Sequence, residues 1–101
     1  MKQLEVPSGA QGQDAAVEMI RFWINGGQDH VSINTGMFAT ADEPACWGMI
    51  AADIVKHAVL GMLEDDPSRD VKSLFAQMDN AFAKRFAENV KVSGQIKGGS
   101  Q

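Results

Sequence analysis

The sequence predicts an α+β protein in which an N-terminal β-hairpin is followed by two α-helices that pack on it. Two stretches typical of strands, residues 17–24 and 30–35, flank a glycine turn at 25–28. A long apolar segment then occupies 44–63, and a second helical segment, 71–86, carries one apolar stripe. The 101 residues suffice for one domain with a modest core.

The turn and the alternation that follows it predict the hairpin. Asn-Gly, here Asn25-Gly26, is the strongest short hairpin signal, because the central positions of the tight turn favour positive φ. The next strand needs a partner, and residues 17–24, rich in branched and aromatic side chains, are the nearest. That next strand alternates between two faces, with Val31, Ile33 and Thr35 on one and His30, Ser32 and Asn34 on the other.

Residues 17–24 also fit a helix, and the sequence leaves this alternative open. Asp14 is a suitable N-terminal cap, and Glu18 and Arg21 lie three residues apart on one helical face. We expect the strand, because the following strand has no other neighbour.

Two helices follow. The first is expected to begin at Asp42 or Glu43, because Pro44 suits the first helical turn and the acidic start complements the helix dipole. It is expected to end near Glu64. Asp66, followed by proline, is predicted to cap the second helix. The stripe of the second helix has steps of four, three, four and four, at Val71, Phe75, Met78, Phe82 and Phe86.

The pattern divides the chain into three parts. Residues 1–13, with proline and glycine among polar residues, are expected to form an extended arm. Residues 14–93 are expected to form a single α+β domain that includes a short strand at Val90–Ser93. Residues 94–101 are expected to form a flexible tail.

Charge and composition exclude several functions. The chain carries 9 basic and 13 acidic residues, a net charge of −4, with no dense basic run, so we expect no nucleic-acid partner.

Cys46 is the one cysteine, which excludes an intrachain disulfide and a cysteine-cluster zinc site, and its expected role is that of a small buried hydrophobe. The two histidines, His30 and His57, offer little for a metal site, and no cofactor motif occurs. The N-terminus lacks the apolar core of a signal peptide, so a cytoplasmic protein is expected.

The segment 44–63 is apolar almost all round. Its ionisable residues are Asp53, Lys56 and His57, and charged groups near the centre of a membrane span cost about 2.5–3.5 kcal/mol each. We therefore expect no membrane span but a buried helix of a soluble protein. One hairpin and one helix can hardly cover such a helix, so the sequence predicts a homo-oligomer, most economically a homodimer. The arm and the tail are the alternative cover.

Five residues are candidates for an interface or a pocket. Asp53 and His57 lie four apart, a spacing that suits a carboxylate orienting an imidazole but also arises often by chance. Trp23 and Trp47 suit a core or an interface, and Gly48 permits close helix approach. No catalytic, cofactor-binding or metal-binding residue is assigned.

The chain resembles a family of short uncharacterised bacterial proteins known as a domain of unknown function. The resemblance covers roughly residues 4–88, and its most specific part is the Pro-Ala-x-Trp-Gly helix start with Asp53 and His57 downstream. It implies the order hairpin then helices, and it implies no functional residue. The segments that carry it are Val6–Ala10, Ala16–Glu18, Phe22–Ile24, Val31–Gly36 and Pro44–Met49.

These observations favour a self-associating interaction or regulatory module without catalysis, with a further protein partner left open. The alternative is a module that binds a small apolar ligand between the hairpin and the helices. An enzyme that uses Asp53 and His57 is the least favoured hypothesis, because no nucleophile stands in a recognisable setting.

Overall fold

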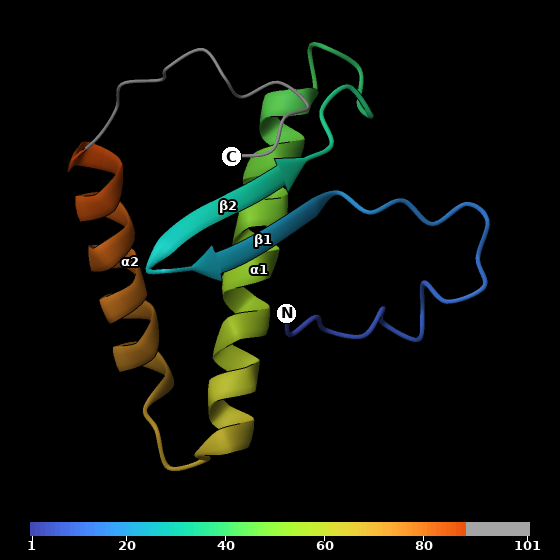
Figure 1. Ribbon diagram of the computed structural model, residues 1–101. Coiled ribbons are helices and arrows are strands. Elements are labelled where there is room, and N and C mark those ends of the chain that lie inside the picture. The colour runs from blue at the N-terminus through green and yellow to red at the C-terminus, as the bar shows by residue number, and fades with distance from the viewer. Residues whose placement is uncertain (89–101) are drawn as a thin grey trace. The chain divides into compact units, whose positions relative to one another are not determined.

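The computed structural model describes residues 1–88 in the order β1, β2, α1, α2 (Figure 1). These residues belong to two compact units, one with the hairpin (1–35) and one with the helices (from Gly36 onward). The order confirms the predicted α+β class. The packing of the helices on the hairpin, the single domain over 14–93 and completion by dimerisation stay predictions. The strand expected at Val90–Ser93 and the tail lie outside the described residues.

Strands β1 (Ile20–Asn25) and β2 (Gln28–Ile33) form an antiparallel hairpin. Asn25 pairs with Gln28, so the turn consists of Gly26 and Gly27, with φ of 62° and 76°. Positive φ at both positions defines the tight turn whose twist matches the strands. The strand prediction for this region is therefore confirmed and the helical alternative is wrong. The glycine pair, rather than Asn25-Gly26, fills the central positions.

The register gives the hairpin one apolar face. Phe22 lies opposite Val31 and Ile20 opposite Ile33, which confirms the predicted alternation of β2. The other face carries Trp23 opposite His30. On the apolar face the Phe22 residue is 56% exposed and Ile24 is 71% exposed.

The N-terminal arm folds back on itself before it reaches β1. The amide of Ala10 donates to the carbonyl of Pro7 at 2.9 Å, and Gln11 Nε2 donates to the carbonyl of Val6 at 2.7 Å. These local bonds form turns within the predicted arm of residues 1–13, because Pro7 and the positive φ of Gly12 favour turns.

Helix α1 (Glu43–Asp65) begins where its sequence predicts. Asp42 is the N-cap residue, and its carbonyl accepts the first helical bond from the amide of Cys46 at 3.0 Å. Pro44 lies in the first turn, where its missing N–H costs nothing. At the other end Asp66 adopts an extended backbone that stops the helix.

Helix α2 (Val71–Glu88) begins later than predicted, and its cap is Asp70 rather than Asp66. Asp70 Oδ2 accepts the amide of Ser73 at 3.0 Å, the bond typical of an N-cap. Asp66 instead organises the turn, because its Oδ1 accepts the Ser68 hydroxyl at 2.6 Å and the Ser68 amide at 3.1 Å. The hydroxyl bond, then the amide bond, hold the pKa of the Asp66 carboxyl below its ordinary value.

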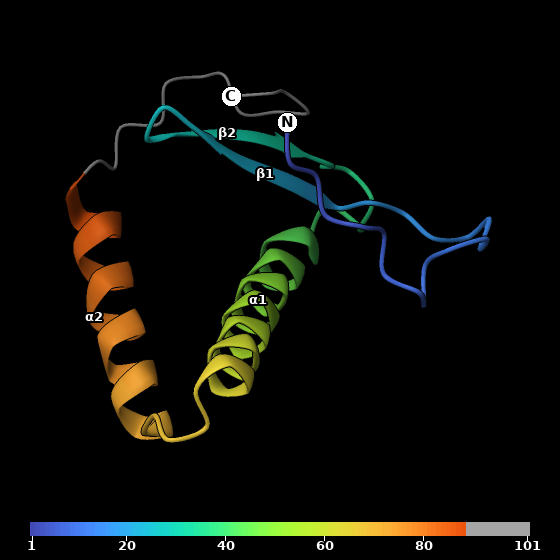
Figure 2. The ribbon, with the colours of Figure 1, turned by 60° about the horizontal axis from the view of Figure 1, so that its bottom comes forward.

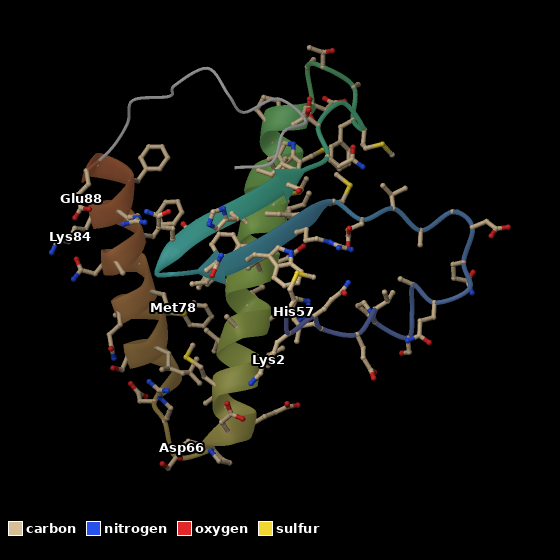
Figure 3. All side chains as sticks on the ribbon, viewed as in Figure 1. Lys2, His57, Asp66, Met78, Lys84 and Glu88 are labelled. Atoms are coloured by element: carbon tan, nitrogen blue, oxygen red, sulfur yellow. The ribbon has the colours of Figure 1, made fainter. Side chains whose placement is uncertain are left out.

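The helices touch mainly near the turn that joins them and diverge towards their other ends (Figure 2). Among the described residues the buried apolar side chains are Val59 of α1 and Leu74 of α2, at 3% and 4% exposure. Met78 points from α2 towards α1, whereas Lys84 lies on the other side of α2 (Figure 3). Two buried side chains and a few half-buried neighbours are a small core for a helix pair.

Candidate functional site

The helical unit carries a large exposed apolar surface, and this surface is the candidate site. Each of its larger side chains is at least 39% exposed. They are Met37, Met49, Ile54, Leu60, Val71, Phe75, Phe82 and Phe86. We call these eight residues the apolar surface.

Aromatic rings mark the end of α2. Phe82 and Phe86 lie one turn apart and stack with ring centroids 5.9 Å apart, and they are 61% and 68% exposed. The predicted stripe of α2 is mostly exposed, because four of its five side chains, Val71, Phe75, Phe82 and Phe86, are at least 39% exposed. Leu74, which lies beside the stripe, is buried, and Met78 is half-buried.

Trp47 is held in place by Glu43, one helical turn earlier. Glu43 Oε2 accepts the indole Nε1–H of Trp47 at 3.1 Å and the amide of Gly36 at 2.8 Å. One carboxylate thus joins the start of the connecting segment 36–42 to the first turns of α1. Sequence reasoning gave Glu43 a role in the helix dipole and missed this contact, although the spacing of four residues was a usable signal.

The other two uncharged candidates differ in their surroundings. Trp23 is half-buried within the hairpin unit, on the face that also carries His30. Gly48 is exposed in α1, and a Cβ placed on it meets nothing within 4 Å. No described part of the chain uses the close approach that Gly48 permits.

Asp53 and His57 are both exposed on α1. The side chain of His57 lies on the side of α1 away from α2 (Figure 3). Within residues 1–88, no hydrogen bond or ion pair joins Asp53 to His57. Their role as interface or pocket candidates stays a prediction.

Cys46 is half-buried in the first turns of α1 and is a free thiol. In the described part of the chain, no three His, Cys, Asp or Glu side chains come together in a group that could hold a metal ion.

A shallow hollow of about 300 Å³ lies at the open end of the hairpin. It is lined by residues 18–21 and 32–35. Glu18 and Arg21, which lie at its wall, bind each other through two bonds of 3.1 Å. The pair predicted for a helix thus forms in an extended segment, and it neutralises the charge that the hollow could offer to a ligand.

Helix α1 has the length and composition of a membrane span, with 23 residues and few charges. Of its most apolar window 6% is buried. A core helix of a soluble protein meets the same criteria of length and composition, so this feature decides nothing alone. The expected absence of a membrane span stays a prediction.

Comparison with known proteins gives a family. The family model of the domain of unknown function DUF5076 matches residues 3–90. The chain therefore belongs to the DUF5076 family, which agrees with the resemblance stated from its residues. No curated protein matches the chain.

A solved structure shares the fold. It is provisionally named a pyruvate dehydrogenase, from the photosynthetic bacterium Rhodopseudomonas palustrus CGA009. The two chains are 16% identical with a TM-score of 0.73, and the match covers 96% of this chain and 94% of that one. At this identity the likeness shows the fold and carries no activity to this chain.

Proposed function

We propose that this protein is a self-associating interaction or regulatory module without catalysis, and that it assembles as a homodimer. The observation that supports the proposal is the apolar surface of the helical unit. Soluble monomers rarely expose contiguous apolar patches of more than a few hundred Å².

The area suits a dimer interface. A large apolar side chain carries roughly 150–200 Å² of surface, so eight at about half exposure leave on the order of 600–800 Å². A standard interface buries about 800 Å² on each partner. The apolar surface in total therefore approaches what one partner contributes to a stable complex, although Met49 and Ile54 lie about 140° apart around α1, so one interface covers only part of it.

The energy is of the same order as the cost of association. Full burial of one such side chain stabilises by about 1.5–3 kcal/mol, so completing the burial of eight half-exposed ones contributes roughly 6–12 kcal/mol. Association costs an estimated 4–15 kcal/mol in lost freedom. A surface of this size can sustain a dimer when most of it is covered.

Native mass spectrometry of the untagged full chain, combined with light scattering across a dilution series, tests the proposal. A dimer has twice the 10.9 kDa chain mass and dissociates on dilution. A monomer at every concentration overturns it. Additional bound mass on a monomer supports the alternative of an apolar-ligand module. In a separate assay, co-sedimentation of a monomeric chain with lipid vesicles would support an α1 that associates with a membrane instead of a second copy.

A further inference from the structure

We propose that two copies of this chain meet through one row of side chains on α1, crossing antiparallel about a two-fold axis that passes between Ile54 and Val55. This inference rests on the proposed self-association and names its surface. The row consists of Met49, Asp53, Lys56 and Leu60 and is called the α1 row below.

The α1 row is a single exposed stripe. Its steps of four, three and four residues keep the side chains within about 60° around the helix, since each residue advances by about 100°. Met49 is 60% exposed, Leu60 is 58% exposed, and Asp53 and Lys56 are exposed as well. Val59, which packs near α2, lies about a quarter turn away around the helix.

The row is self-complementary when it is reversed. It reads apolar, acidic, basic, apolar from one end. In an antiparallel crossing each Met49 meets Leu60 of the second copy, and each Asp53 meets Lys56 of the second copy. A parallel crossing in register would place like charges together instead, which is unfavourable. Charge therefore selects a second copy in one orientation.

The same pairing accounts for charges in an apolar helix. From Pro44 to Leu63, α1 has one acidic residue, Asp53, and one lysine, Lys56. A charge covered by an apolar partner surface is costly unless an opposite charge meets it there. The two-fold axis places Lys56 of the second copy opposite each Asp53, so the dimer contains two such ion pairs. An apolar contact between Met49 and Leu60 lies at each end of the row.

Charge reversal tests the surface. Asp53→Lys gives a row with two cations and Lys56→Asp gives a row with two anions. Each variant alone is expected to raise the dimer dissociation constant at least about tenfold at low salt, because like charges then face each other twice. An equimolar mixture of the two variants is expected to restore dimerisation as a heterodimer. The double variant Asp53→Lys/Lys56→Asp is expected to dimerise like the wild type.

Matched controls lie on α2. Asp79→Lys and Lys84→Asp make the same changes in net charge at exposed positions, and Lys84 lies on the side of α2 away from α1 (Figure 3). These controls are expected to dimerise like the wild type. Far-ultraviolet circular dichroism of each variant checks that the helices are formed before association is measured.

Disulfide trapping gives a second readout. In a Cys46→Ala background, a chain with Met49→Cys is mixed with a chain with Leu60→Cys under mild oxidation. The antiparallel crossing predicts a disulfide-linked heterodimer in the mixture. Neither chain alone should cross-link, because equivalent positions lie about 16 Å apart along the axis, too far for a disulfide.

The outcomes separate the two proposals. A wild-type dimer whose charge variants associate unchanged, or whose cysteines cross-link 49 to 49, overturns the α1 row and leaves self-association intact. A wild-type chain that is monomeric at every concentration overturns both. Selective pairing of the two oppositely charged variants establishes the α1 row.

Discussion

Leu74 is the residue whose truncation tests the small core most directly. It is 4% exposed on α2, and it is one of the two buried apolar side chains among the described residues, the other being Val59 of α1. Leu74→Ala removes three carbon groups, worth about 0.8 kcal/mol each on burial, which gives about 2.4 kcal/mol. The cavity left behind adds to this, and buried Leu→Ala changes cost 2–5 kcal/mol in all. We expect a loss of about 3 kcal/mol in the free energy of unfolding.

Urea unfolding followed by circular dichroism measures this loss. Leu4→Ala is the matched control, because it makes the same chemical change at a side chain that is 93% exposed, and it should change stability by less than about 0.5 kcal/mol. Several protein concentrations are compared, since association with a second copy adds to apparent stability. If Leu74→Ala costs no more than Leu4→Ala, the helices do not pack through Leu74 and the described core is wrong.

Three further predictions concern local contacts. Glu43→Ala removes the acceptor that holds the Trp47 indole and should lower stability by about 1–3 kcal/mol, with an altered indole N–H resonance in NMR; an unchanged resonance contradicts the contact. Gly27→Ala places a Cβ at a φ of 76° and should destabilise the hairpin by about 1–2 kcal/mol in thermal unfolding, and equal stability would refute the turn. Ser68→Ala removes the strongest bond to Asp66, so the pKa of that carboxyl, measured by NMR titration, should rise towards its ordinary value. Because folding lowers this pKa, the Asp66 contribution to stability is present above the unfolded pKa and fades as pH falls towards the folded pKa; a Ser68→Ala pKa equal to the wild type would exclude the hydroxyl bond as its cause.

Local chemistry made most of the fold predictable. The Asn25-Gly26 signal and the alternation of β2 identified the hairpin, although Gly26 and Gly27 fill the turn and β1 begins at Ile20 rather than three residues earlier. The start of α1 followed from Pro44 and its acidic neighbour. The start of α2 was misplaced because Asp66 and Asp70 are equally good caps by type. Only the geometry of the turn assigns the cap to Asp70.

The candidate site was less predictable. The sequence indicated that α1 has more apolar surface than one hairpin and one helix can cover, and this stays a prediction; within the structure Met49 and Leu60 are exposed. It did not indicate that Asp53 would stand apart from His57, since a spacing of four residues brings side chains near each other without fixing their rotamers. The two hydrogen bonds that Glu43 accepts, from Trp47 and from Gly36, were not predicted either. The bond from Gly36 joins the helix to the preceding loop, and helical spacing does not indicate such a contact.

The sequence by itself determined the elements and their order, because turns, caps and periodicity act over a few neighbouring residues. The tertiary structure decided which sides of the helices are covered. Helix α1 is apolar around most of its circumference, so its pattern predicts no preferred face, whereas the structure buries Val59 on α1 and Leu74 on α2. With the Val59 side of α1 buried, the α1 row is exposed. Because Asp53 and Lys56 lie between Met49 and Leu60, the row is complementary to the same row of a second, antiparallel copy.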